Sequence, residues 1–273
     1  MTDNLEALEV QLLTEGLFRL HGVDFRNYAY ASLRRRVWNA VKAEGLTTIT
    51  ALLDRVLHDP AVKDRLLHQL SVHVTSMFRD PSFFASFRRN VVPLLRSHPF
   101  IRIWHVGCAT GEEVYSMAIL LEEEGLLQRA RLYATDMNEA VLTQARRGIF
   151  PSSQVDEYAR NYSLAGGKAR LADYYTNRYE YVIFRHALRR NVVFAHHNLA
   201  TDGSFNEFNV VLCRNVMIYF DRVLQARVHE LLYSSLRRFG VLALGRKESL
   251  RGTPHEGDYV EVDRVEKIYR RDA

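Results

Sequence analysis

Short strand-like apolar runs alternate with helical segments through most of the chain after about residue 100. The predicted strands are residues 101–106, 131–135, 192–195, 210–213 and 241–244, and a helix is predicted over residues 225–239. Parallel neighbours in a sheet must be joined by long crossover connections, which are usually helices. The alternation therefore predicts an α/β fold with a mostly parallel, doubly wound sheet.

Two regions depart from this alternation. Residues 151–191 are rich in tyrosine, contain Gly166-Gly167 and have weak periodicity, which predicts a small, partly β insertion. Residues 259–262 and 265–269 are two short apolar runs, and they predict an antiparallel hairpin that closes the sheet at its C-terminal side.

The first part of the chain is predicted to be entirely helical. Leucines recur at helical spacing before Gly22, and Asp24, Thr48 and Asp59 are candidate N-caps of three further helices. Asp80 before Pro81 is a candidate N-cap of another helix. The predicted domains are residues 1–75, all-helical, and residues 76–273, which contain the sheet and the insertion.

Composition limits the classes of protein to consider. Of 273 residues, 47% are hydrophobic and 25% charged, which is typical of a globular protein. No apolar run approaches the roughly 20 residues of a membrane span, and the first residues are acidic, so we expect a cytoplasmic protein that is not membrane-inserted.

Two cysteines are too few for a disulfide scaffold, and the histidines lack ligand spacing, so no metal is expected. The net charge of +5 permits an anionic partner.

One strand–turn–helix segment carries the strongest chemical signal. The strand 101–106 runs into Gly107-Cys-Ala-Thr-Gly111 and then a helix, and Asp136 ends the next strand, 25 residues after Gly111. Ligands of doubly wound sheets bind beyond the carboxyl ends of the strands, and an acidic residue at about this interval often binds ribose hydroxyls. The pattern predicts an adenosine-containing cofactor.

Glu112 and Glu113 decide between cofactors. They follow the glycine turn directly, where a pyrophosphate would need positive potential. S-adenosylmethionine carries a sulfonium and an amino group, so it suits two carboxylates better than NAD does. The alternative is structural, because first-turn carboxylates also stabilise a helix through its dipole.

Five segments, in this order, resemble the motifs of a known family. They are Val74–Asp80, Ala109–Ser116, Ala134–Met137, Asn198–Leu199 and Cys213–Phe220. Together they resemble the CheR family, the bacterial chemotaxis receptor glutamate O-methyltransferases. The resemblance covers almost the whole chain and implies a Rossmann-like class I methyltransferase sheet, preceded by a small all-α domain.

The resemblance also implies the site residues. The cofactor-binding positions are His73, Thr75, Arg79, Glu113, Asp136, Asn198, Leu199, Arg214 and Asn215. Among these, Glu113 matches the position at the methionine amino end, Asp136 that at the ribose, and Asn198 and Leu199 those at the adenine. His73 stands where many members have asparagine.

The implied reaction transfers a methyl group from S-adenosylmethionine to glutamate side chains of a chemoreceptor or related signalling protein, giving methyl esters and S-adenosylhomocysteine. Because glutamate is already ionised at neutral pH, the reaction needs alignment and exclusion of water rather than a general base. Arg79 and Tyr219 are the expected catalytic residues. Arg34, Arg35 and Arg36 are expected to dock the acidic methylation helix of the receptor.

Other interpretations stay open at this point. A nucleic-acid methyltransferase would suit the basic charge, but the chain lacks the Pro-Pro-Tyr type of base clamp, so no nucleic-acid partner is expected. A non-catalytic signalling module that binds S-adenosylmethionine or S-adenosylhomocysteine is the alternative. The 151–191 segment does not match the loop with which some members bind a receptor pentapeptide, so pentapeptide tethering is not expected.

Overall fold

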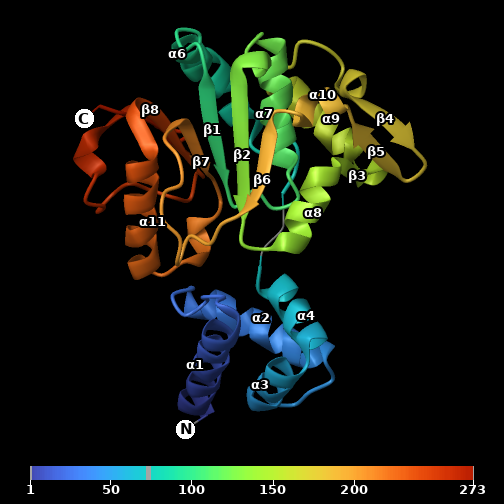
Figure 1. The fold of residues 1–273 in the computed structure, drawn as a ribbon, viewed down its shortest axis with the longest axis vertical. Helices are drawn as coiled ribbons and strands as arrows, with labels where there is room; N and C mark the ends of the chain where they lie inside the picture. The colour runs from blue at the N-terminus through green and yellow to red at the C-terminus, as the bar shows by residue number, and fades with distance from the viewer. Residues whose placement is uncertain (1, 72–74, 273) are drawn as a thin grey trace. The chain divides into compact units, whose positions relative to one another are not determined.

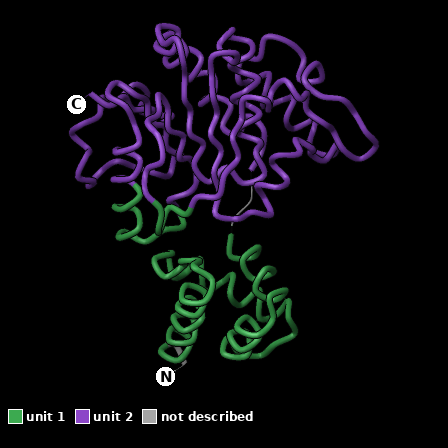
Figure 2. The backbone as a smooth tube through the Cα atoms, in the orientation of Figure 1, with its two compact units in different colours: residues 1–72, 198–202, 219–228 green, residues 73–197, 203–218, 229–273 purple. Residues whose placement is uncertain are grey.

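The computed structural model describes residues 2–71 and 75–272, and its backbone forms two compact units (Figure 2). Unit 1 comprises residues 1–72, 198–202 and 219–228, and unit 2 comprises residues 73–197, 203–218 and 229–273. Among the described residues, no helix combines the length and the apolar character that spanning a bilayer requires.

Four helices make up most of unit 1. They are α1 (Thr2–His21), α2 (Tyr30–Ala43), α3 (Ile49–His58) and α4 (Pro60–Leu70) (Figure 1). Their facing sides bury Leu17, Val37 and Leu52 completely. The structure confirms the expected all-helical segment. The leucines whose spacing predicted α1 are exposed, however, and α1 packs through Val10, Leu13 and Leu17; the exposed leucines are Leu5, Leu8, Leu12 and Leu20.

Two of the three predicted N-caps in this segment are confirmed. The Thr48 side chain accepts a hydrogen bond from the backbone N–H of Ala51 (3.1 Å), and Asp59 accepts one from Ala61 (2.8 Å). The prediction for Asp24 is wrong, because α2 begins only at Tyr30. Asp24 instead accepts hydrogen bonds from both the backbone N–H and the guanidinium of Arg26, so its carboxylate is engaged two residues along the chain and not at the start of α2.

A seven-stranded sheet forms the centre of unit 2, in the order β6-β2-β1-β7-β8-β10-β9 (Figure 1). The strands are β1 (Ile101–Val106), β2 (Ala130–Asp136), β6 (Val192–His196), β7 (Phe208–Cys213), β8 (Leu236–Leu244), β9 (Tyr259–Asp263) and β10 (Ile268–Arg271). β1 pairs in parallel with β2 and β7, and β10 is antiparallel to both β8 and β9. The predicted mostly parallel sheet with a C-terminal antiparallel hairpin is confirmed.

Helices connect and cover these strands. They are α5 (Pro81–Ser86), the π-helix η1 (Phe87–Val91), α6 (Val92–Leu95), α7 (Glu112–Glu123), α8 (Glu139–Arg147), α10 (His186–Arg189) and α11 (Arg222–Ser235). The sequence predicts that α11 continues to Phe239, but β8 begins at Leu236. Leu236 is 1% exposed and pairs with Phe208 of β7, so burial in the sheet overrides local helical propensity there.

The predicted partly β segment forms a second, three-stranded antiparallel sheet. Its order is β3-β5-β4, from β3 (Ile149–Pro151), β5 (Tyr181–Phe184) and β4 (Tyr175–Arg178). Between β3 and β4 lies α9 (Val155–Leu164).

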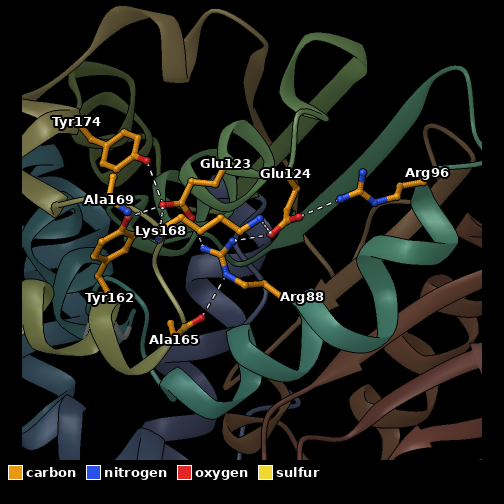
Figure 3. A network of polar contacts seen from close by, with 9 residues as sticks. All are labelled: Arg88, Arg96, Glu123, Glu124, Tyr162, Ala165, Lys168, Ala169 and Tyr174. Atoms are coloured by element: carbon orange, nitrogen blue, oxygen red, sulfur yellow. Dashed lines mark hydrogen bonds and ion pairs between the residues drawn. The ribbon is translucent and has the colours of Figure 1, made fainter.

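A buried polar network joins this second sheet region to the end of α7 (Figure 3). The Glu123 side chain is 3% exposed and accepts hydrogen bonds from the hydroxyls of Tyr162 and Tyr174 and from the backbone N–H of Lys168. It also forms an ion pair with Arg88 of η1, whose side chain is 10% exposed. Because a buried carboxylate is costly unless its oxygens are paired, this network fixes the position of residues 162–174 against α7.

Candidate functional site

The carboxyl ends of β1 and β7 meet because the two strands are parallel neighbours in the sheet. Gly107 begins the turn after β1 with a φ of +63°, and a Cβ atom there would lie 2.8 Å from Cγ2 of Val216 in the loop after β7. Only glycine permits this close approach with this backbone conformation. The first glycine of the turn therefore brings the two loops into contact.

Asp136 is held at the end of β2 by backbone hydrogen bonds. One carboxylate oxygen accepts from the N–H of Ala109 (3.0 Å), and the other accepts from the N–H of Asn138 (3.0 Å). Burial raises the pKa of Asp136 above its ordinary value, and these backbone bonds oppose the rise. An ionised carboxylate has about four acceptor sites, so Asp136 retains capacity for hydroxyl donors of a ligand.

Glu113 lies in the first turn of α7 and is engaged on both oxygens. Oε1 lies 3.0 Å from Nδ1 of His105 on β1, and Oε2 accepts from Nη1 of Arg214 at 2.9 Å. Burial alone would raise the pKa of Glu113, but His105 and Arg214 bring it below its ordinary value. Glu113 is therefore a stabilised anion at the carboxyl ends of the strands.

Arg214 follows β7 and joins three parts of unit 2. Its side chain is 3% exposed; besides Glu113, it donates to the Asp80 carboxylate (2.8 Å) and to the backbone carbonyl of Arg79 (3.4 Å). The guanidinium carbon lies 3.9 Å from the centre of the Phe83 ring, a cation–π contact.

Asp80 occupies the N-cap position of α5, as predicted, but its side chain does not cap the helix. α5 begins at Pro81 as expected, but Asp80 has a φ of +57° and makes no side-chain capping bond. Its carboxylate binds the buried Arg214 guanidinium instead, because that charge must be paired.

Glu248 organises the loop after β7, and sequence reasoning missed it. The side chain, on a residue 5% exposed, accepts from the backbone N–H groups of Asn215 (2.9 Å), Val216 (2.8 Å), Met217 (2.8 Å) and Gly245 (2.6 Å). Burial raises the pKa of Glu248, and these bonds oppose the rise. The only local signal was an acidic residue directly after the basic pair that follows β8.

The structure places the predicted site residues as follows. Unit 2 holds Thr75 and Arg79, both half-buried, together with Glu113, Asp136, Arg214 and Asn215 at the strand ends. It brings Glu113, Arg214 and the Arg79 backbone into direct contact. Unit 1 holds Asn198, Leu199, Tyr219 and Arg34–Arg36. His73 lies outside the described residues.

Asn198 and Leu199 form a compact turn in unit 1. The Asn198 side-chain oxygen accepts from the N–H of Ala200 (3.0 Å), and the Asn198 N–H donates to the Asp202 carboxylate (2.9 Å). Both Asn198 and Leu199 are buried, at 6% and 8% exposure.

The three arginines on α2 have different environments. Arg34 and Arg35 are exposed, and Arg34 pairs with Glu6 of α1. Arg36 is buried: it donates to the Leu70 carbonyl, and its guanidinium carbon lies 4.8 Å from the centre of the Tyr219 ring. Burial lowers the pKa of Arg36, although Tyr219 partly offsets this. Within unit 1, Arg36 thus supports the ring of Tyr219.

The groups in unit 2 suit a charged adenosine compound. Asp136 can accept from hydroxyls, Glu113 offers negative charge, and the buried Nε of Arg214 has no hydrogen-bond partner among the described residues. Within the same described part of the chain, no group of three or more His, Cys, Asp or Glu side chains could hold a metal ion.

Comparison with known proteins identifies two matching families and several relatives. The family described as CheR methyltransferase, SAM binding domain, matches residues 73–265, and CheR methyltransferase, all-alpha domain, matches residues 8–71. The Pseudomonas putida protein named putative methyltransferase Cher3 is 46% identical over 97% of each chain. The chemotaxis protein methyltransferase 2 of Pseudomonas aeruginosa is 28% identical (90% of this chain, 88% of the relative), and the chemotaxis protein methyltransferase of Listeria monocytogenes is 27% identical (84% and 85%).

Proposed function

The chain belongs to the CheR methyltransferase family and uses S-adenosylmethionine, and we propose that it methylates glutamate side chains of a chemoreceptor or a related signalling protein. The observation that carries the proposal is the match of both family domains along nearly the whole chain. The relatives named chemotaxis protein methyltransferases support the chemoreceptor as the class of substrate.

The site chemistry agrees with a carboxylate acceptor. When bound, S-adenosylmethionine supplies an activated methyl group on a sulfonium, which a glutamate oxygen takes up as the carbon–sulfur bond breaks, leaving S-adenosylhomocysteine and a methyl ester. An ionised carboxylate needs no base to remove a proton, so the protein has to bind, orient and exclude water. Glu113 and Arg214 are held in one fixed network, as such positioning requires.

We assign the cofactor contacts by position. Asp136 binds the ribose hydroxyls, Glu113 with Arg214 and Asn215 binds the amino-acid end, and Asn198 with Leu199 binds the adenine. We assign the remaining cofactor contacts to Thr75, Arg79 and His73, of which His73 lies outside the described residues. The free acceptor capacity of Asp136 and the stabilised charge of Glu113 support these assignments.

We assign the reaction itself to two side chains. The Arg79 guanidinium holds the substrate carboxylate near the methyl group, and the Tyr219 hydroxyl orients it. The Arg36 contact with the Tyr219 ring supports this role for Tyr219 by limiting the positions of the ring. Of the three arginines expected to dock the substrate, Arg34 and Arg35 are exposed, and they attract the acidic methylation helix.

The test is transfer of a labelled methyl group to receptor-rich bacterial membranes, followed by mild alkali. Methyl esters release methanol under these conditions, whereas N-methyl groups survive. We compare the wild type with Asp136→Ala and with Glu139→Ala, which removes an exposed carboxylate three residues away. Alkali-labile label that is lost only in Asp136→Ala is the expected result.

Two outcomes would contradict the proposal. Alkali-stable label would mean that a nitrogen or carbon atom is methylated. Tight binding of S-adenosylhomocysteine without any transfer would favour the non-catalytic signalling module.

A further inference from the structure

A pocket of about 670 Å³ lies in unit 2, beyond the carboxyl end of β8. Its walls are the loop after β8 and the hairpin of β9 and β10, and residues that line it include Lys247, Arg251, Tyr259, Arg264, Lys267 and Tyr269. None of the residues assigned above to the cofactor or the reaction is among its lining residues.

Positive charge predominates in this pocket. Lys247, Arg251, Arg264 and Lys267 form no ion pair with any residue in the described part of the chain, whereas Arg246 is neutralised by Glu266 at 2.6 Å. A pocket lined by unpaired cations favours an anionic occupant.

The acidic lining residues offset only part of this charge. The Glu248 carboxylate is already satisfied by four backbone N–H groups. Glu256 and Glu261 remain, and Glu256 accepts from the N–H of Gly252 (2.9 Å). Among the lining residues, four cations without an ion pair therefore outnumber these two carboxylates, and the pocket has a net positive charge.

The pocket adjoins the candidate site through Glu248. Glu248 forms part of the pocket wall, while its carboxylate holds the loop of Asn215, Val216 and Met217 after β7. An occupant of the pocket would therefore lie beside the loop that carries Arg214 and Asn215.

We propose that this pocket binds acidic side chains of the methyl-accepting protein that flank the methylated glutamate, an inference that rests on the proposed function. The cations come from two separate segments, Lys247 and Arg251 after β8 and Arg264 and Lys267 between β9 and β10. Carboxylates spaced along a peptide can reach such separated cations one by one. A compact, multiply charged anion would lie close to Glu256 and Glu261 as well, which disfavours phosphate.

The test is charge reversal by Lys247→Glu with Arg264→Glu. Lys267 is left intact because its φ of +55° is a strained backbone conformation, so a substitution there could change the backbone as well as the charge. The control is Arg131→Glu with Arg147→Glu, two exposed arginines without an ion pair to a described residue, at the amino end of β2 and the end of α8. The probes are a fluorescein-labelled glutamate-rich helical peptide and the same peptide with glutamine in place of glutamate.

We expect wild type and control to bind the glutamate peptide alike, and the reversed variant to bind it about tenfold more weakly. The KM for receptor-rich membranes rises by a similar factor, while kcat and the affinity for S-adenosylhomocysteine stay unchanged. The glutamine peptide binds all three proteins weakly.

Unchanged peptide affinity and KM in the reversed variant, with wild-type ester formation intact, would overturn the pocket assignment alone. ATP or inorganic phosphate that displaces the peptide at lower concentration than the peptide itself would assign the pocket to a small anion. Absence of alkali-labile methyl groups with the wild type would instead refute the proposed function, so the two failures are distinguishable.

Discussion

Glu113 shares its two carboxylate oxygens between His105 and the buried guanidinium of Arg214. The substitution Glu113→Gln leaves Arg214 with Asp80 as its one remaining carboxylate among the described residues. Because a buried charge that loses a partner is costly, we expect the free energy of unfolding to fall by about 2 kcal/mol. Affinity for S-adenosylhomocysteine should fall as well.

Urea denaturation and calorimetric titration measure these two effects. Glu139→Gln is the control, because its ion pair with Arg146 is exposed and should change the unfolding free energy by less than about 0.5 kcal/mol. Equal losses of unfolding free energy in both variants would show that the Glu113 network stabilises the fold no more than an exposed ion pair does.

Glu6 pairs with one of the two exposed docking arginines, Arg34. Hydrogen bonding to Arg34 lowers the pKa of Glu6, so the carboxylate is charged at neutral pH and competes with an acidic substrate. We expect Glu6→Gln to lower the KM for receptor-rich membranes severalfold and Arg34→Gln to raise it. Kinetics at one fixed salt concentration measure both, and a higher KM for Glu6→Gln would refute docking at Arg34.

At the scale of elements, Gly167 packs tightly against the ring of Tyr162 in the second sheet region. A Cβ atom at Gly167 would lie 2.2 Å from the ring carbon Cζ of Tyr162, whose hydroxyl donates to Glu123. We expect Gly167→Ala to lower the free energy of unfolding by about 2 kcal/mol through overpacking, and to speed hydrogen exchange in α9.

Gly203 provides the matched control. A Cβ atom there meets no atom within 4 Å, so Gly203→Ala should leave the stability within about 1 kcal/mol of the wild type. Unaltered exchange in α9 of the Gly167→Ala protein would show that the ring adapts without loosening the network.

The second half of α11 carries a buried histidine, His229, whose titration affects stability. Burial lowers the pKa of His229 from 6.5 to about 4, partly opposed by a hydrogen bond with the Ser249 backbone. The folded state thus binds fewer protons than the unfolded state between these two values. The free energy of unfolding therefore falls as the pH drops below about 6.5, by roughly 3 kcal/mol at most once the pH is below 4.

Urea denaturation at pH 7 and at about pH 5 measures the effect. We expect His229→Gln to show a smaller difference between the two pH values than the wild type, and His186→Gln, at an exposed position, to show the same difference as the wild type. An undiminished difference in His229→Gln would assign the acid sensitivity to other groups.

At the scale of the whole molecule, the net charge of +5 acts on an acidic substrate at long range. Raising the salt concentration from about 50 to about 200 mM shortens the Debye length and should raise the KM for receptor-rich membranes severalfold. Affinity for S-adenosylhomocysteine should change much less, because the carboxylates assigned to it, Glu113 and Asp136, are half-buried and less screened by salt. Equal salt dependence of both quantities would argue against electrostatic attraction of the substrate.

Local sequence signals predicted the elements and their order. Helical periodicity, the caps at Thr48 and Asp59, and the strand–turn–helix at Gly107 depend on residues a few positions apart, which the chain presents together. The same signals failed at Asp24 and at the end of α11, and at Asp80 they predicted the N-cap position but not the partner of its side chain. At these places a guanidinium or a neighbouring strand supplied a stronger interaction than the local segment offers.

The amino-acid sequence by itself determined the fold class, the family and the residue types at the ends of the strands. Only the tertiary structure decided how these residues combine. The bond between Glu113 and Arg214 spans 101 positions, and Glu248 reaches back 33 positions to Asn215. Such contacts form because the sheet brings distant strand ends together and buried charges must find partners there, whereas periodicity and capping act only between neighbours along the chain.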